Sequence, residues 1–325
     1  MIKKRLLVFL TVALALGCLT GCGAGTNKKK DGLTVVTTIF PLYDWTENIV
    51  GETSSGVEVK LLLESGVDLH SYQPTASDIM TIGNSDVFIY VGGESDAWVT
   101  DALRNAANKD MIVLNLMDIL GDALHEEELV EGMQGEEESE GGEEEGPEYD
   151  EHIWLSLKNA KLLCDCIAEK LAAADPANAD TYRANAKAYC EKLAELDGRY
   201  EKTVSEAGTK TLLFGDRFPF RYMTEDYKLK YYAAFIGCSA ESEASFETIA
   251  FLAQKVDELS LKCVVALDGS DHKIAETIIR NTKSADQTII EMNSLQSVTK
   301  KDVQNGTTYL SVMEDNLKAL QEALK

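Results

Sequence analysis

Two of the four histidines in the chain stand in segments that could bind a metal ion. His70 lies in residues 66–74 (GVDLHSYQP) and His152 lies in residues 150–156 (DEHIWLS); the other two are His125 and His272. Imidazole nitrogen is a common protein ligand for zinc and its first-row neighbours. Because the chain has so few histidines, two in such settings predict a metal site.

An acidic tract separates these two histidines. Residues 121–151 carry fifteen Asp or Glu and no Lys or Arg. A segment with few apolar side chains and many like charges cannot bury enough surface to order itself, so we predict a disordered loop. Clustered carboxylates bind divalent cations weakly, so the loop could collect metal beside the site. The alternative is a solvated loop without a specific role.

The N-terminal residues have the pattern of a processing signal. A basic start is followed by an apolar run over residues 6–16, which is too short to span a bilayer. Residues 19–22 (LTGC) look like a bacterial lipobox, so we predict that residues 1–21 are removed and that Cys22 carries lipid. The alternative is an ordinary secretory signal. Residues 22–32 would form a flexible tether.

Composition narrows the class of protein further. The formal charge of −24 repels nucleic acid and anionic lipid and attracts cations. A length of 325 residues with 45% hydrophobic residues suits one large or two medium domains. The remaining cysteines match no zinc-knuckle or Cys-x-x-Cys spacing, so we expect buried, apolar roles, with a disulfide between segments as the alternative. They are Cys164, Cys166, Cys190, Cys238 and Cys263.

Apolar patterning predicts two α/β lobes joined by a long helix. Strands and helices alternate with short connections, which is typical of a parallel sheet covered on both faces. Strands are expected at 34–39, 57–63, 86–91, 111–114, 211–214, 231–236, 262–267 and 287–291. Helices are expected at 41–50, 76–82, 98–107, 157–174, 177–207, 246–259, 274–282 and 309–324. The helix over 177–207 would extend about 45 Å.

These elements define the expected architecture. The fold class is α/β, with two lobes that are each a mostly parallel sheet flanked by helices. One long helix joins the lobes, and the ligand cleft lies between them. Residues 33–156 form the N-terminal lobe, residues 157–208 the connecting helices, and residues 209–325 the C-terminal lobe.

Two further side chains follow strands of the second lobe. Asp216 comes after the strand at 211–214, and His272 follows the strand at 262–267. Ligands of open α/β sheets gather at such carboxyl ends, so both are candidate metal ligands. Alternatively, Asp216 caps a helix and His272 is a solvated helix-start residue. Glu243 is a weaker candidate carboxylate. Imidazole with carboxylate oxygen suits Zn²⁺, or Mn²⁺ or Fe²⁺ if more oxygens join, and no cysteine ligand is expected.

Several motifs occur in an order that resembles a known family. After the lipobox come Asp-x-His-x-Tyr-x-Pro at 68–74, the charged loop, His-Ile-Trp-Leu at 152–155 and the long helix. Residues 237–245 (GCSAESEAS) and 308–317 (TYLSVMEDNL) follow. From residue 33 to residue 325 the chain resembles the cluster A-I solute-binding proteins, which are the metal-binding lipoproteins of zinc and manganese ABC importers.

The resemblance carries expectations about the site. His70 and His152 match the first two histidine ligands of the family. The third ligand, a His or Glu in the family, corresponds to Asp216, and Asn293 stands where the family often has Asp. These departures leave the metal and its coordination number open, and His272 is the natural replacement.

The resemblance also carries expectations about function. It implies a monomeric carrier with a stiff helical spine that is not an enzyme. This carrier delivers a divalent metal, with zinc favoured, to an ABC permease and its ATPase at the cell membrane.

Two other functions deserve comparison. A metal-dependent hydrolase would use an open metal position to activate water. However, the chain has no His-Glu-x-x-His helix, no Gly-x-Ser-x-Gly elbow and no phosphate loop. A surface adhesin is compatible with metal transport, because related lipoproteins have been assigned adhesion roles.

Overall fold

The computed structural model describes residues 32–51, 56–135, 148–239 and 243–325. The predicted signal peptide, Cys22 and nearly all of the tether lie outside these residues. Residues 33–325 form one compact unit. Within the described residues, no helix is both long and apolar enough to cross a membrane.

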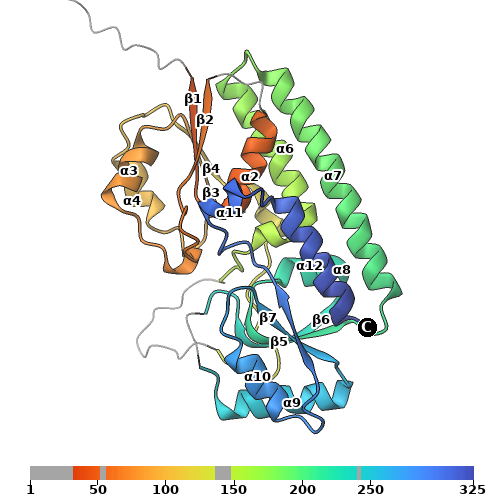
Figure 1. Ribbon diagram of the computed structural model, residues 1–325. Helices are drawn as coiled ribbons and strands as arrows, with labels where there is room; N and C mark the ends of the chain where they lie inside the picture. Colours follow the sequence, from red (N-terminus) through yellow and green to blue (C-terminus); the bar gives the residue numbers. More distant parts are fainter. Residues whose placement is uncertain (1–31, 52–55, 136–147, 240–242) are drawn as a thin grey trace, which may run out of the picture. The chain divides into compact units, whose positions relative to one another are not determined.

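The N-terminal lobe is built on a four-stranded parallel sheet with the strand order β2-β1-β3-β4. Its strands are β1 (Leu33–Thr37), β2 (Val57–Leu61), β3 (Val87–Tyr90) and β4 (Ile112–Asn115). Consecutive residues of β1, such as Val35 and Val36, are both fully buried, because helices cover both faces of the sheet. Its helices are α2 (Phe40–Val50), α3 (Ala76–Gly83), α4 (Val99–Arg104) and α5 (Leu116–Leu120) (Figure 1).

The C-terminal lobe repeats this plan with the strand order β6-β5-β7-β8, again entirely parallel. Its strands are β5 (Thr211–Phe218), β6 (Lys230–Ile236), β7 (Cys263–Leu267) and β8 (Thr288–Met292). The helices of this part of the chain are α8 (Arg221–Tyr227), α9 (Phe246–Leu259), α10 (Lys273–Arg280), α11 (Lys300–Gln304) and α12 (Tyr309–Ala323). Of these, α11 lies against the N-terminal lobe, where the Lys300 amide donates to the Glu64 carbonyl at 2.9 Å (Figure 1). The fold class predicted from the sequence is therefore confirmed, and both sheets are wholly parallel.

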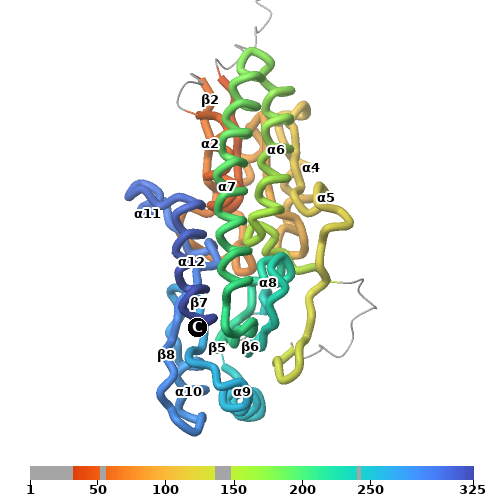
Figure 2. Tube along the Cα trace, turned by 90° about the vertical axis from the view of Figure 1, so that its right-hand side faces the viewer, coloured from red at the N-terminus to blue at the C-terminus, as the bar shows by residue number. Residues whose placement is uncertain are grey.

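Two long helices, α6 (Leu157–Ala174) and α7 (Ala179–Glu206), run side by side along the N-terminal lobe, and α7 continues to the C-terminal lobe (Figures 1 and 2). The 28 residues of α7 extend about 42 Å. The Tyr189 hydroxyl donates to Asp44 Oδ2 of α2 at 3.0 Å, and the Tyr200 hydroxyl donates to the Met313 carbonyl of α12 at 2.7 Å. The helix is thus tied to both lobes.

The apolar core is continuous from one lobe to the other. A single cluster of buried residues includes Val35 of β1, Leu163 of α6 and Phe214 of β5. Smaller clusters fill the outer faces of the two sheets, around Phe88 in the N-terminal lobe and Leu252 in the C-terminal lobe. A shared core of this kind resists bending between the lobes, because any hinge motion would expose apolar surface.

The described parts of the acidic tract, residues 121–135 and 148–151, are ordered, which corrects the prediction of a disordered loop for these residues. The Gln134 amide donates to the Ala234 carbonyl on edge strand β6 at 2.9 Å, and the Glu127 amide donates to the Glu148 carbonyl at 2.9 Å. Val130 and Met133 pack against the core. Backbone hydrogen bonds and these apolar side chains hold the segment in place. The acidic composition gave no indication of either kind of contact. Residues 136–147 lie outside the described residues.

Candidate metal centre

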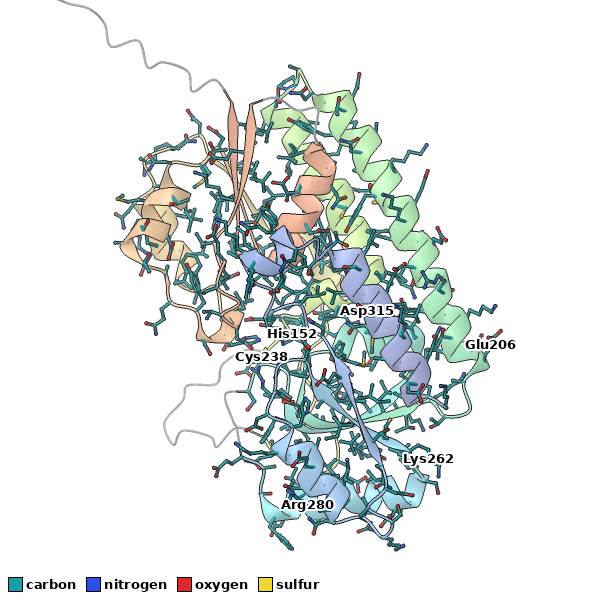
Figure 3. All side chains as sticks on the ribbon, viewed as in Figure 1. His152, Glu206, Cys238, Lys262, Arg280 and Asp315 are labelled. Atoms are coloured by element: carbon teal, nitrogen blue, oxygen red, sulfur yellow. The ribbon has the colours of Figure 1, made fainter. Side chains whose placement is uncertain are left out.

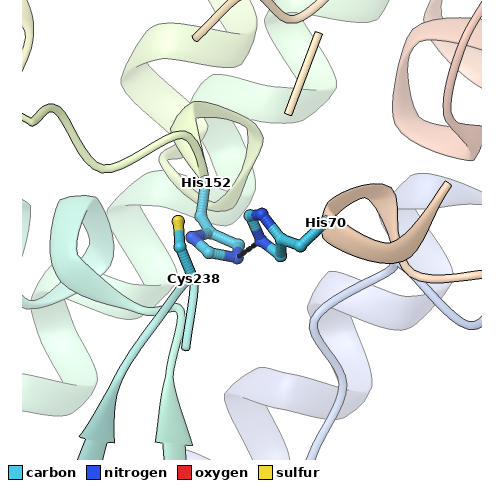
Figure 4. A group of neighbouring side chains, drawn as sticks. All are labelled: His70, His152 and Cys238. Carbon is cyan, nitrogen blue, oxygen red and sulfur yellow. Dashed lines mark hydrogen bonds between the residues drawn. The ribbon is translucent and has the colours of Figure 1, made fainter. Parts of the chain in front are cut away.

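His70 and His152 come from two tight turns that meet between the lobes. His70 lies in a 3₁₀ turn (Leu69–Ser71) after β2, and its backbone amide donates to Asp68 Oδ1 at 3.0 Å. His152 precedes a second 3₁₀ turn (Ile153–Leu155), whose three side chains are buried. The Nε2 atoms of the two imidazoles lie 3.1 Å apart (Figure 4).

This separation fits a shared metal ion. In a tetrahedral zinc site with Zn–N bonds of about 2.0–2.1 Å, two ligand nitrogens lie about 3.3 Å apart. The observed Nε2–Nε2 distance of 3.1 Å is close to that value. Both rings therefore present a donor atom at the spacing that one zinc ion requires.

The opposite ring nitrogens are occupied by supporting groups. Nδ1 of His152 lies 3.1 Å from Asp150 Oδ1. Nδ1 of His70 lies 2.7 Å from Ser95 Oγ and 3.5 Å from Glu151 Oε2. Two consecutive carboxylates, Asp150 and Glu151, thus stand behind the two imidazoles. Partners of this kind fix ring orientation, and here they leave both Nε2 atoms facing one another.

The two imidazoles differ in their affinity for protons. Burial and the neighbouring His152 charge lower the pKa of His70 to about 3. Burial also acts to lower the pKa of His152, but the Asp150 carboxylate, with Glu151 and Asp68, outweighs it and raises that pKa above its ordinary value. A proton added to the metal-free pair therefore goes to His152 in preference to His70.

Asp216, predicted as a ligand, is engaged elsewhere. Strand β5 runs through this position to Phe218 instead of ending at Phe214. The Asp216 carboxylate accepts the Leu267 amide at 3.1 Å and the Arg217 amide at 2.9 Å. The Arg217 guanidinium is paired with Asp68 Oδ2 at 2.8 Å. The sequence pattern predicted that the strand ends at Phe214, which would have left the Asp216 carboxylate free at the strand end. In the structure, Asp216 lies within β5.

His272 also lies apart from the imidazole pair. It precedes α10 as the N-cap residue with a left-handed backbone (φ 57°), and its Nε2 atom is 3.1 Å from Glu291 Oε1. Together with Asp216 it lines a separate cavity of about 380 Å³. Asn293 bonds to the Leu295 amide and to Asp268, and Glu243 is exposed. The structure thus brings His70 and His152 together, but not Asp216, His272, Glu243 or Asn293.

Cys238, which the sequence did not suggest as a ligand, lies close to both imidazoles. Donor atoms of His70, His152 and Cys238 lie within 4.8 Å of one another, which makes them the one such group of three among the described residues. Figures 3 and 4 show Cys238 next to His152. The sequence holds one signal for the position of this cysteine. Cys238 follows β6 by two residues, at the carboxyl end of the sheet.

His70 opens onto a cavity of about 580 Å³ with acidic walls. His70 and Cys238 line it together with the carboxylates of Glu127, Glu148 and Glu151. Glu127 and Glu148 belong to the ordered ends of the acidic tract. A cation approaching the imidazoles therefore passes through a region of negative charge.

Comparison with known proteins identifies the family. Residues 35–323 match the family model described as the zinc-uptake complex component A, periplasmic. The chain belongs to this family. The zinc-binding lipoprotein AdcA of Streptococcus pneumoniae strain R6 is 32% identical over 317 residues, which are 96% of this chain and 60% of AdcA. The high-affinity zinc uptake system protein ZnuA of Bacillus subtilis is 30% identical, over 100% of this chain and 99% of that protein.

Solved structures of related proteins share the fold. The Zn(II)-bound ZnuA-like domain of Streptococcus pneumoniae AdcA has a TM-score of 0.69 and 30% identity, covering 90% of this chain and 99% of that one. The metal-dependent lipoprotein YcdH of Bacillus subtilis has a TM-score of 0.72 and 28% identity, covering 90% and 100%. This zinc-uptake family chain thus has the two-lobed architecture of its relatives.

Proposed function

We propose that the chain captures zinc outside the cytoplasm and delivers it to an ABC permease and its ATPase, acting as a monomeric carrier and not as an enzyme. The observation that carries this proposal is the pair of Nε2 atoms 3.1 Å apart, each backed by a carboxylate or hydroxyl. Membership in the zinc-uptake family supports the same metal. His70 and His152 are the two proposed ligands on the N-terminal side of the cleft.

Direct titration tests this proposal. Chelator-stripped mature protein should bind one zinc ion in calorimetric titration, and zinc should displace manganese at equal concentration, because imidazole donors favour zinc. The metal-loaded protein should hydrolyse neither ester nor peptide substrates. Absence of tight zinc binding would refute the proposal, whereas turnover of such substrates would favour a metallohydrolase.

The support behind His70 should contribute to affinity. Gly93 has a φ of +79°, and a Cβ atom there would lie 2.3 Å from Glu151 Oε1, which accepts the Ser95 amide at 2.9 Å. We therefore expect Gly93→Ala to displace Glu151, loosen the Ser95–His70 contact and weaken zinc binding about 10- to 100-fold. Competition with a chelating dye measures the change.

Gly269→Ala is the matched control for this variant. Gly269 has a φ of +80° but nothing within 4 Å of the added Cβ, so it incurs the same backbone strain without the clash. Equal zinc affinities in the two variants would show that the Glu151 support does not act on the metal.

Lipid anchoring at Cys22 is proposed from the LTGC motif of residues 19–22. Cys22→Ser should release the protein from the membrane fraction and abolish incorporation of labelled fatty acid. Cys18→Ser serves as the control and should remain anchored. Lipid labelling that persists in Cys22→Ser and disappears in Cys18→Ser would assign the anchor to Cys18.

A further inference from the structure

The carboxylates and the amide that support the imidazole pair do not supply a third metal ligand. The carboxylates of Asp150 and Glu151 face the Nδ1 atoms, away from the Nε2 pair. The Gln296 side chain approaches Nε2 of His152 at 3.2 Å through its amide nitrogen, while its oxygen accepts the Leu69 amide. None of these groups offers a free, strong donor on the Nε2 side.

The candidates predicted from sequence do not fill the position either. Asp216 is held by two backbone amides, and His272 lines the other cavity beside Glu291. Among the described residues, Cys238 alone joins His70 and His152 in a group of donor atoms within 4.8 Å.

The turn that carries Cys238 is built to approach His152. A Cβ atom at Gly237 would lie 2.9 Å from His152 Cε1 and 2.9 Å from the Phe218 carbonyl. Only glycine therefore allows the chain after β6 to pass this close to the ring. The Cys238 amide is fixed in turn by a bond of 3.3 Å to Glu127 Oε1. The thiol thus reaches the imidazole through specific local packing.

We propose that Cys238 is the third metal ligand, so that the two imidazoles and one thiolate form a His₂Cys site that favours zinc and other thiophilic divalent cations; this inference rests on the proposed function. On binding, the S–H bond breaks and a sulfur–metal bond forms, and the proton passes to solvent through the open cavity. No oxidation occurs.

The coordination requires a small inward movement of the sulfur. Zn–S and Zn–N bonds of about 2.3 and 2.0 Å place sulfur and nitrogen about 3.6 Å apart in a tetrahedral site. The present donor atoms lie within 4.8 Å, with the sulfur beside the His152 ring (Figure 4). Cysteine has a single side-chain torsion, so rotation about χ1 is the movement that brings the thiolate inward.

Thiolate coordination changes the preference among metals. Soft sulfur ligands favour zinc over manganese, whereas a site completed by oxygen discriminates less. We expect Cys238→Ser to weaken zinc binding about 10- to 100-fold while manganese affinity changes less than threefold. Cys166→Ser is the matched control, because Cys166 is a partly exposed thiol on α6 outside the donor group.

Cobalt(II) spectroscopy on the full mature chain tests the ligand directly. The parent protein and Cys166→Ser should show sulfur-to-cobalt charge-transfer absorption in the near ultraviolet at one equivalent of Co²⁺. Cys238→Ser should bind Co²⁺ without that absorption. One equivalent bound by the parent without charge transfer would overturn the cysteine ligand and leave zinc capture standing, even if the variant failed to fold. Absence of both Co²⁺ and Zn²⁺ binding by the parent would overturn both proposals.

Discussion

His152→Ala is expected to remove nearly all of the stability that zinc confers. A ligand that binds only the folded state adds about 4 kcal/mol to the free energy of unfolding at a free concentration 1,000 times its Kd. A thousandfold loss of affinity would reduce this gain to about 0.4 kcal/mol at the same zinc concentration. We expect a loss of that order, because removal of His152 takes away one Nε2 donor and also the partner of His70.

The measurement is thermal or denaturant unfolding with and without zinc for each protein. His152 is fully buried, so the variant also leaves a cavity and destabilises the metal-free protein. The informative quantity is therefore the increase in the free energy of unfolding that zinc causes in each protein. The absolute free energy of unfolding is not informative, because the cavity also lowers it.

His272→Ala is the matched control. Its imidazole lies beside Glu291 in the other cavity, so its zinc increment should equal that of the parent. If His272→Ala lost the increment and His152→Ala kept it, the ligand assignment proposed for this cleft would be refuted.

The sequence predicted the elements that depend on local periodicity. Helices α6 and α9 have the predicted bounds, and the other predicted strands and helices are found with shifted ends. Short elements such as α5, α8 and α11 were not predicted, because five to seven residues do not establish a helical repeat. The two lobes and the long helix α7 could be predicted because apolar residues recur at regular spacing over long segments, and this spacing is visible in a single sequence.

The site was predicted only in part, and the reason is tertiary packing. His70 and His152 were found because their residue types and neighbouring motifs are distinctive. Asp216 was misplaced because β5 continues past an irregularity in its pairing with β6, between Phe214 and Arg217. The proximity of Cys238 to the imidazoles was not predicted, because a cysteine between a strand and a turn has no local signature. Only the folded sheet shows that it stands beside His152.

The acidic tract is a second case in which tertiary contacts decide the structure and the sequence alone did not predict it. Composition suggested that residues 121–151 lack structure, yet Glu127 and Glu151 have buried carboxylate oxygens next to the imidazole pair. Their order comes from backbone pairing with β6 and within residues 125–150, which no count of charges reveals. Part of the negative charge of this tract therefore lines the cavity beside His70 and does not lie in bulk solvent.

Acidification should weaken zinc binding with a proton dependence that distinguishes the two imidazoles. Both must be neutral to ligate a metal. The pKa of His70 is lowered to about 3 by burial and the His152 charge, so His70 is already neutral above pH 4. The pKa of His152 is raised above its ordinary value near 6.5, because the effect of Asp150 and its neighbours exceeds that of burial. At a pH below the pKa of His152, zinc must therefore displace one imidazole proton, and the affinity begins to fall at a higher pH than it would for an ordinary histidine.

The slope of log Kd against pH measures that proton count. We use Cys238→Ser, which removes any proton released by the thiol, and titrate zinc from pH 5 to pH 8 in buffers that do not bind metal. Below the pKa of His152 the slope should be about one logarithmic unit of Kd per pH unit, whereas two ordinary histidines would give about two below pH 6.

Asp150→Asn supplies the check. Loss of the carboxylate behind His152 should lower the pKa of that imidazole and move the onset of the affinity loss to a lower pH. A slope of two in Cys238→Ser, or an onset that Asp150→Asn leaves unchanged, would contradict the assignment of the displaced proton to His152.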